Sequence, residues 1–430
     1  MSVTRRGGTT REHAREELRY YGDEAHRWYD WLIRVSGGQQ RFRTRILPGV
    51  ALGLALVVGL TAWAVTPRPG KDGSAGPGHL AATPVAAASS AAVTAAPSPT
   101  AEPTAEPTVA PAGPPARPRA QPAGTSGAFP TGVSAANTSQ ANAFANFRGR
   151  ANDVVVVFTA RDKWSAITGP WIGLEPKFFS NFPGTWVVTV PMYPEPSGSV
   201  DTDVYARSHL AACARGEYDK YFRQFGQWLN SKNRGDSFVR IGWEFNGGWF
   251  VWKAIDRNNW RECFRNEAKA LLSVAPQARI DWSVNAHTPL PDGGDPFAVY
   301  PGNDVVDVIG MDTYDQYPPS PTAAKFDEQC KMGSPLPGLC RVINFARQNN
   351  KLFSVPEWGL VHQDTPAGRR GVAGGDNPVY IQQMYNLLLR NRDILAYEAY
   401  FNDPDLGNVG SSLVNPTQHP NAANLYQQLW

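Results

Sequence analysis

Eight short apolar segments, mostly separated by segments with helical periodicity, constrain the fold of this chain more than any other feature. Runs of β-branched residues without alternation are typical of parallel strands buried on both faces. Eight strand–helix units in about 300 residues predict an α/β fold, a (β/α)8 barrel. An open doubly wound sheet is the alternative, but no glycine-rich nucleotide loop follows any strand. The predicted strands are 130–135, 153–158, 186–191, 238–244, 279–285, 305–312, 352–357 and 395–401, and the clearest helices are 139–148, 216–231, 258–274, 339–349 and 378–390.

Residues 46–66 are predicted to be a transmembrane helix that acts as an uncleaved signal anchor. The run 46–65 contains no charged residue and is long enough to cross a bilayer. Three arginines lie in the five residues before it, so the positive-inside rule places the preceding residues in the cytoplasm and the following ones outside. We therefore expect a single-pass protein of the cell membrane. A cleaved signal peptide is the alternative, because residues 62–64 (Ala-Trp-Ala) resemble a cleavage site.

Two further segments flank the predicted anchor. Residues 67–126 are rich in proline, alanine and threonine and cannot bury a core, so they are predicted to be a disordered linker to the barrel domain, 127–430. The basic tail, 1–45, carries an apolar stripe at helical spacing between residues 18 and 35. This stripe could rest on the inner membrane surface, bind a cytoplasmic partner, or only fix the orientation of the chain. The formal charge of +3 gives no reason to expect a nucleic-acid partner.

All four cysteines follow the predicted anchor, on the side where disulfides persist: Cys213, Cys263, Cys330 and Cys340. Their spacing fits no zinc-binding pattern, and neither a metal nor a cofactor is expected. Sequence alone allows three pairings. Cys330–Cys340 is the natural local pair, which leaves Cys213–Cys263.

Two predicted strands end on a glutamate with aromatic residues beside it. Residues 240–252 read Arg-Ile-Gly-Trp-Glu-Phe-Asn-Gly-Gly-Trp-Phe-Val-Trp and place Glu244 at the end of the fourth strand. Residues 353–360 read Phe-Ser-Val-Pro-Glu-Trp-Gly-Leu and place Glu357 at the end of the seventh. A sugar-cleaving site needs a proton donor and flat apolar surfaces, and both motifs supply them.

The two glutamates are expected to face each other across the barrel mouth. Catalytic side chains of such barrels lie at the carboxyl ends of the strands, and the fourth and seventh strands are on opposite sides. Carboxylates about 5–5.5 Å apart are typical of retaining glycosidases. In these enzymes one carboxylate attacks the anomeric carbon, while the other protonates the leaving oxygen and later activates water.

From about residue 129 to the C-terminus the chain resembles glycoside hydrolase family 26, within the clan A barrel enzymes. The segment from Arg240 to Trp252 is similar to the family's acid/base motif, and Pro-Glu-Trp-Gly around Glu357 is similar to its nucleophile motif. The resemblance implies that Glu244 is the acid/base and Glu357 the nucleophile. Gly-Met-Asp-Thr-Tyr-Asp, residues 310–315, resembles the sixth-strand segment whose tyrosine, here Tyr314, hydrogen-bonds the nucleophile.

The residue before Glu244 departs from the family pattern. Mannanases of the family usually carry a histidine there, which contributes to the subsite of the cleaved sugar, and this chain has Trp243. The resemblance implies β-mannan as the first substrate to consider. β-1,3-Xylan and mixed-linkage β-glucan are alternatives, because the family also includes enzymes that act on them.

Five further residues are assigned to the substrate-binding site. Arg240 is the predicted ion-pair partner of the nucleophile, and Tyr314 either orients that carboxylate or belongs to the core. Trp249 and Trp358 are predicted sugar platforms, although each could instead pack within the protein. Asn246 either hydrogen-bonds a sugar hydroxyl or braces the bend after the acid/base.

Three functions are consistent with these patterns. The first is a membrane-anchored, extracellular retaining glycosidase that acts on a polysaccharide. The second is a non-catalytic carbohydrate-binding barrel, although a binding protein has no need of two opposed acids. The third is an enzyme that trims or transfers glycan during export of the cell's own polysaccharide. The sugar, the linkage, and endo or exo action do not follow from the sequence.

Overall fold

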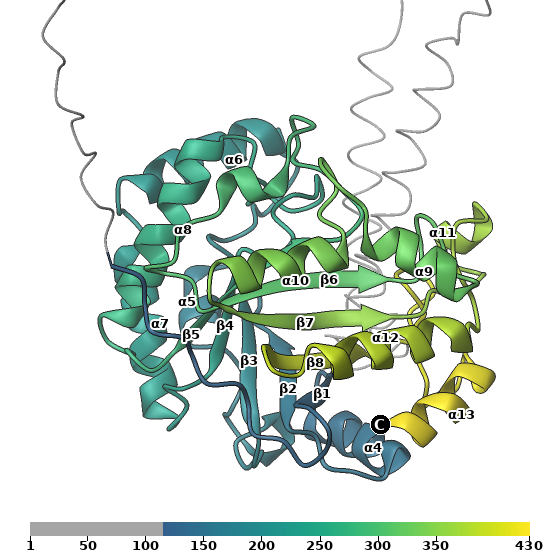
Figure 1. Cartoon of the computed structure of the whole chain (residues 1–430). Coiled ribbons are helices and arrows are strands. Elements are labelled where there is room, and N and C mark those ends of the chain that lie inside the picture. Colours follow the sequence, from purple (N-terminus) through teal and green to yellow (C-terminus); the bar gives the residue numbers. More distant parts are fainter. Residues whose placement is uncertain (1–114) are drawn as a thin grey trace, which may run out of the picture. The chain divides into compact units, whose positions relative to one another are not determined.

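The computed structural model describes residues 115–430, and eight parallel strands there close into a barrel (Figure 1). Each strand pairs with its neighbours in chain order, and the first pairs with the last, from Thr131↔Glu398 to Ser134↔Phe401. The predicted (β/α)8 barrel is confirmed, since an open doubly wound sheet would leave two edges unpaired. The strands are β1 (Thr131–Ser134), β2 (Val154–Phe158), β3 (Thr185–Val190), β4 (Phe238–Ile241), β5 (Arg279–Asn285), β6 (Val308–Tyr314), β7 (Leu352–Gly359) and β8 (Leu395–Phe401).

The predicted tail, anchor and most of the predicted linker lie outside the described residues. Within residues 115–430 no helix has the length and apolar character needed to span a bilayer.

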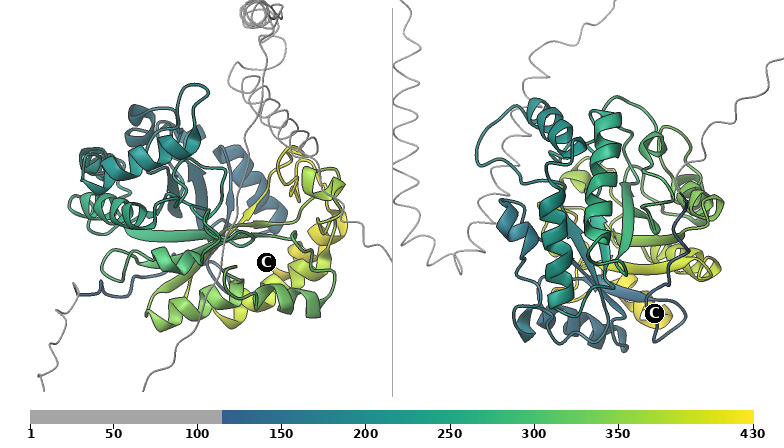
Figure 2. Two further views of the ribbon diagram at one scale, coloured as in Figure 1. Left: turned by 90° about the horizontal axis from the view of Figure 1, so that it is seen from above. Right: turned by 90° about the vertical axis from the view of Figure 1, so that its left-hand side faces the viewer.

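Helices surround the barrel, and each predicted helix is present within a few residues of its expected bounds (Figure 2). Residues Thr202–Ala214 form a helix that the sequence did not predict, because its buried face consists only of Ala206, Leu210 and Cys213 and gives weak periodicity. The helices are α4 (Thr138–Arg148), α5 (Trp164–Thr168), α6 (Thr202–Ala214), α7 (Asp219–Ser231), α8 (Arg257–Leu272), α9 (Ala323–Cys330), α10 (Leu339–Gln348), α11 (Pro366–Arg369), α12 (Pro378–Arg390) and α13 (Pro420–Leu429), with 3-10 turns η1 (Pro176–Phe178) and η2 (Pro296–Val299).

Residues 115–126, here called the floor strap, lie across the end of the barrel where the strands begin (Figure 1, dark blue; Figure 2, right). Ala123 is buried against the lower barrel core, and its amide donates to the carbonyl of Ala396 at 2.9 Å. Nε of Arg117 donates to Asp307 at 2.9 Å. The linker was predicted to continue to residue 126, and the structure instead makes its last part a component of the barrel.

The barrel interior contains a layer of buried polar side chains beneath the mouth. Asp281 accepts hydrogen bonds from Ser283 Oγ at 2.8 Å, Ser354 Oγ at 2.7 Å and Tyr397 OH at 2.6 Å. Gly310 of β6 makes room for this cluster, because a Cβ there would lie 2.5 Å from Ser283 Oγ. Satisfied polar groups of this kind hold neighbouring strands in one arrangement, so the floor of the site is rigid.

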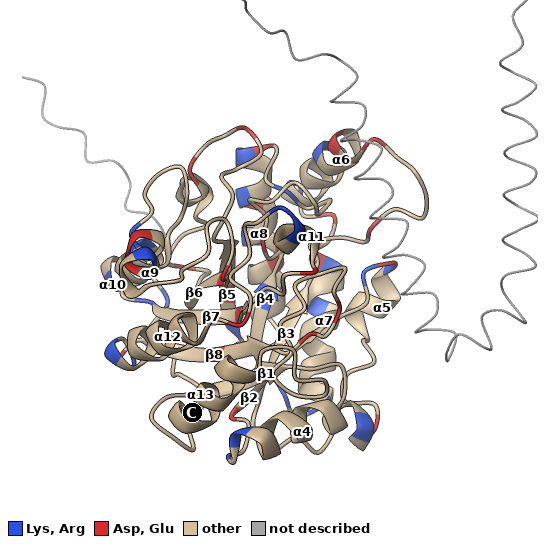
Figure 3. Cartoon of the chain, turned by 90° about the vertical axis from the view of Figure 1, so that its right-hand side faces the viewer, with Lys and Arg blue, Asp and Glu red and all other residues tan. Residues whose placement is uncertain are grey.

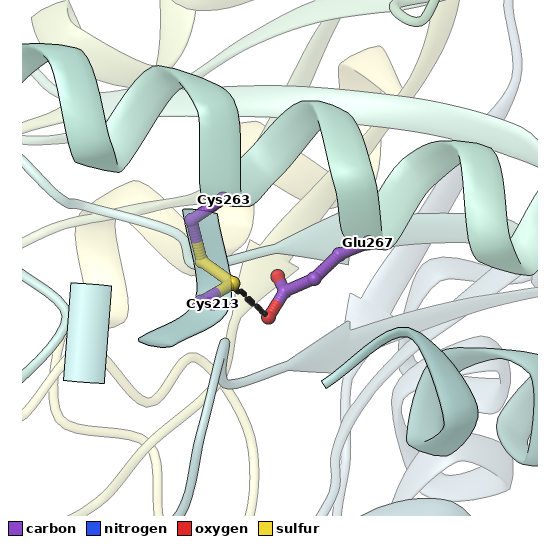
Figure 4. Close-up of side chains that lie close together, drawn as sticks. All are labelled: Cys213, Cys263 and Glu267. Atoms are coloured by element: carbon purple, nitrogen blue, oxygen red, sulfur yellow. Dashed lines mark hydrogen bonds between the residues drawn. A yellow bond between two sulfur atoms is a disulfide. The ribbon is translucent and has the colours of Figure 1, made fainter. Parts of the chain in front are cut away.

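Both predicted disulfides are confirmed. Cys330–Cys340 joins α9 to α10, and Cys213–Cys263 joins α6 to α8. Glu267 of α8 lies fully buried beside the second bridge, with Oε1 3.3 Å from Cys213 Sγ (Figure 4). Burial raises the pKa of Glu267 well above its ordinary value. A disulfide sulfur has no proton to donate, so the protonated carboxyl is the donor in this contact.

Candidate active site

Glu244 lies in a tight turn after β4 rather than at the strand's last residue. The strand ends at Ile241, and the backbone then takes left-handed conformations at Gly242 (φ 54°) and Glu244 (φ 51°). The Glu244 amide donates to Ser283 O at 3.2 Å, and its carbonyl accepts from Gly247 N at 2.9 Å. A non-glycine residue in this region costs roughly 1–2 kcal/mol, and such strain concentrates at functional sites.

The carboxyl group of Glu244 is half-buried and has two hydrogen-bond donors. Asn285 Nδ2 donates to Oε1 at 2.6 Å, and Trp249 Nε1 donates to Oε2 at 3.0 Å. Burial, followed by the charge of Glu357, raises the pKa of Glu244 to about 7, although both donors oppose the shift. A carboxyl group with this pKa can donate and accept a proton near neutral pH.

Trp249 lies over the turn and is exposed to solvent over 42% of its surface. Gly247 allows this position, because a Cβ there would lie 2.4 Å from the indole ring. The indole therefore combines an accessible face with a hydrogen bond to Glu244. This geometry is that of a sugar platform, and the role itself stays a prediction.

Glu357 of β7 is almost completely buried, and both of its oxygens have partners. Arg240 Nη1 donates to Oε1 at 2.9 Å, and Tyr314 OH donates to Oε2 at 3.3 Å. The expected ion pair with Arg240 and the hydrogen bond from Tyr314 are thus both present. Glu357 is held in one orientation, as a nucleophile requires.

Arg240 is fully buried and holds a second carboxylate, that of Asp312, at 2.5 Å. Its remaining donors reach Thr189 Oγ1 at 3.1 Å and Ser283 Oγ at 3.3 Å. Burial lowers the pKa of Arg240, but Asp312 and Glu357 outweigh it and raise that pKa. Arg240 was predicted among substrate-binding residues, and this is corrected, because no part of its side chain is accessible. It acts on substrate only through Glu357.

Trp358 is not a sugar platform, because it is fully buried on the helix-facing side of β7. Its ring lies 5.4 Å from that of Trp430, and its Nε1 donates to Glu398 Oε2 at 2.6 Å. Successive residues of a strand point to opposite faces, so Glu357 and Trp358 cannot both face the mouth. This prediction was wrong.

Asn246 braces the turn and does not reach substrate. Its Oδ1 accepts from Asn285 N at 2.8 Å, and its Nδ2 donates to Asn285 O at 2.8 Å and Thr288 O at 2.7 Å. The side chain is 1% exposed. Asn246 thus ties the turn that carries Glu244 to the end of β5, which resolves the alternative that the sequence left open.

Trp243, at the place where the resemblance expects histidine, belongs to a buried aromatic cluster. Its ring lies 4.6 Å from Trp252, 4.7 Å from Phe250 and 5.6 Å from Phe158. With 3% of its surface exposed, Trp243 offers little to a ligand. Trp243 is therefore a core residue that precedes Glu244 in the turn.

Two residues at the site were not assigned a role from the sequence. Asn285 ends β5 and bonds Glu244, and its position at a strand end is the signal that could have identified it. His287, two residues after the end of β5, lies against β6, with Nε2 accepting from Tyr314 N at 3.4 Å. Burial lowers the pKa of His287 to about 4, so the ring is neutral at neutral pH.

Residues 219–343 match the model of glycosyl hydrolase family 26. The matched segment includes Glu244, Asn285 and Tyr314, whereas Glu357 follows it in the chain. No curated protein sequence matches this chain.

Several solved structures are similar to this chain. A modular endo-beta-1,4-mannanase from Cellulomonas fimi is 17% identical, with a TM-score of 0.46 over 66% of this chain and 64% of that chain. GH26C from Muricauda sp. MAR_2010_75 is 15% identical, with a TM-score of 0.47 over 70% and 84%. A GH26 beta-mannanase from Bacteroides ovatus is 13% identical, with a TM-score of 0.46 over 70% and 85%. The chain thus spans less than two thirds of the Cellulomonas fimi protein. The chain is thus similar to glycosyl hydrolase family 26 over residues 219–343.

Proposed function

We propose that this protein is a retaining glycoside hydrolase that cleaves a β-linked polysaccharide outside the cell. The observation that carries the proposal is the contrast between two glutamates at one end of the barrel. Arg240 and Tyr314 hold Glu357 in a fixed orientation. Glu244 has a pKa of about 7 and therefore has a proton to give. Carboxyl groups with such different environments are suited to different steps of one reaction.

The reaction proceeds by double displacement. Glu357 attacks the anomeric carbon while Glu244 gives its proton to the departing glycosidic oxygen, which leaves a glycosyl ester on Glu357. Glu244, now a carboxylate, then takes a proton from water, and the resulting hydroxide equivalent displaces Glu357 from the sugar. Both glutamates return to their starting protonation states, and the anomeric configuration is retained.

β-Mannan is the first substrate to test. The accessible indole of Trp249 beside the acid/base suits stacking on a pyranose ring. Trp243 in place of histidine removes a polar contact near the cleaved sugar, so β-1,3-xylan and mixed-linkage β-glucan belong in the same panel.

The Glu244→Gln and Glu357→Gln variants test this proposal. We expect each to lower hydrolysis of the preferred polymer by at least about a thousandfold, measured as new reducing ends, with binding retained. The matched control is Glu262→Gln on the outer face of α8, where the side chain is 51% exposed. Full hydrolysis by both active-site variants would show that neither glutamate is catalytic. Binding without hydrolysis by the wild-type protein would leave a carbohydrate-binding barrel as the explanation. Elongated oligosaccharides in place of new reducing ends would identify a transferase.

We further propose that residues 46–65 anchor the enzyme in the cell membrane with the barrel outside. The proposal is supported by the uncharged run and by the arginines before it. Fractionation of cells that express the full chain tests it, because an anchored protein stays in the membrane pellet at high salt and is released only by detergent. Activity in the cell-free medium without detergent would contradict it.

A further inference from the structure

Tyr317 is an exposed aromatic residue in a strained conformation at the mouth of the barrel. It follows β6 by three residues, has a φ of 50° and is 39% exposed. Among residues 115–430, only Phe179, Glu244 and Tyr317 are non-glycine, non-asparagine residues with left-handed backbone. Phe179 is buried. Strain that the surrounding structure maintains in an exposed tyrosine indicates a function for its position.

Two loops hold Tyr317 in place. Its amide donates to Val372 O at 3.1 Å, and the preceding Gln316 forms an antiparallel bridge with Ala373. The loop after β6 is therefore tied to the loop after β7. The wall that carries Tyr317 is fixed relative to both strands that supply Tyr314 and Glu357.

A short series of contacts connects Tyr317 to the candidate nucleophile. Its ring lies 6.3 Å from the ring of His287, and His287 Nε2 accepts from the amide of Tyr314 at 3.4 Å. The hydroxyl of Tyr314 donates to Glu357 at 3.3 Å. These contacts place Tyr317 on the same side of the mouth as Tyr314 and Glu357.

Arg370 lies against this tyrosine and has unused donors. Its Nη2 donates to Tyr317 OH, and its guanidinium carbon is 5.7 Å from the ring centre. Within residues 115–430 no carboxylate lies within ion-pair distance of Arg369 or Arg370, whereas Arg257 and Arg347 each pair with an aspartate. Figure 3 looks onto the carboxyl ends of the strands and shows the basic segment at α11 above them. Guanidinium N–H groups without a carboxylate partner form a ready site for one.

We propose that Tyr317 and Arg370 form a sugar subsite that takes an acidic sugar, with the ring stacked on Tyr317 and its carboxylate on Arg370. This inference rests on the proposed glycosidase function and narrows its substrate to a β-glycan that carries carboxylates. The aromatic ring supplies contact area for the pyranose face, and the guanidinium supplies charge and directed donors. The two acids nearest in sequence to Arg370 are directed elsewhere. Asp364 lies 3.7 Å from His362 Nδ1, and Asp376 accepts from Asn421 N at 3.0 Å and from Ala422 N at 2.9 Å.

The test uses two polymers with the same backbone, neutral β-glucomannan and β-glucomannan partly oxidised at C6 to carboxylates. We expect the full-length enzyme to cleave the oxidised polymer with about three- to fivefold higher kcat/KM. Arg370→Gln should remove this preference, and about 0.5 M NaCl should reduce it. Arg390→Gln is the matched control. Arg390 is exposed at the C-terminal end of α12, so this substitution should leave the preference unchanged. Tyr317→Ala should weaken binding of both polymers.

Affinity gel electrophoresis with both polymers separates this inference from the proposed function. If neither polymer is cleaved but Arg370→Gln selectively loses retention by the oxidised one, the subsite stands and the glycosidase proposal fails. Equal treatment of the two polymers by the wild-type protein would overturn the subsite. A preference for the oxidised polymer that the Arg370→Gln variant retains would also overturn the subsite. Normal binding of both polymers by the Tyr317→Ala variant would overturn the stacking platform.

Discussion

Replacing Trp249 with phenylalanine should move the alkaline limit of activity to higher pH. The substitution keeps an aromatic ring over Gly247 but removes the N–H that donates to Glu244 Oε2 at 3.0 Å. This bond stabilises the ionised carboxylate, so its loss raises a pKa that is already about 7.

The size of the shift follows from the exposure of the indole. A hydrogen bond to a charged group contributes roughly 1.5–3 kcal/mol, but Trp249 is 42% exposed and water replaces much of the lost contact. About 0.7 kcal/mol remains, and at 1.36 kcal/mol per unit this corresponds to about half a pKa unit. Asn285→Ala removes a shorter and more buried donor, at 2.6 Å, so its shift should be larger.

The assay is the pH dependence of kcat/KM, whose alkaline limb reports the proton on Glu244 in the free enzyme. Trp228→Phe is the control, because this half-buried tryptophan on α7 stacks on Phe225 and not on the site. If the alkaline limbs of the Trp249→Phe and Trp228→Phe variants coincide, the indole N–H of Trp249 does not lower the pKa of Glu244. A shift of the Trp249→Phe limb to lower pH would refute the assignment of Glu244 as the proton donor.

Three further predictions concern the polar groups that support the site and the core. Arg240→Met leaves two buried carboxylates without their cation and should lower the free energy of unfolding by about 3–5 kcal/mol in urea titrations; an unchanged midpoint would contradict the buried ion pairs. Tyr314→Phe should lower kcat about fivefold with little change in KM and no change in melting temperature, because it removes only the donor to Glu357; an unchanged kcat would leave Tyr314 as core. Burial raises the pKa of Glu267 in the folded state. The contribution of its protonated carboxyl to stability is therefore complete below the unfolded-state pKa of about 4.3 and is lost as pH rises through the folded-state pKa. Glu267→Gln should therefore unfold at higher urea than wild type at pH 8 and at the same urea at pH 4, and a difference of equal size at both pH values would refute the buried neutral acid.

The barrel and the positions of its two glutamates were predictable because the strand topology determines where the strand ends lie. Once eight strands alternate with helices, the ends of β4 and β7 must converge on one face, whatever lies between Glu244 and Glu357. The fourth strand was nevertheless predicted to reach Glu244. It ends three residues earlier, because the chain turns through left-handed conformations at Gly242 and Glu244, and an apolar run carries no signal for such a turn.

Side-chain direction was the part least accessible from the sequence. Strand alternation would have placed Trp358 opposite Glu357, but its aromatic character suggested a platform. Asn285 was not assigned because a lone asparagine at a strand end has no distinguishing pattern, and its partner Glu244 is 41 residues away in the chain. The floor strap was predicted to be linker because its proline- and alanine-rich composition gives no sign of the backbone hydrogen bonds and the Arg117 ion pair that hold it to the barrel.

The floor strap also determines how mechanical load would enter the enzyme. If the proposed anchor holds the N-terminal side of the chain while a polymer is bound at the mouth, a pulling force would reach the barrel through residues 115–126. The first links to give way would be the ion pair of Arg117 with Asp307 and the amide of Ala123 on Ala396, since these are peripheral to the closed ring of strands. Such a force would therefore separate the floor strap from the barrel before it distorted the site at the carboxyl ends of the strands.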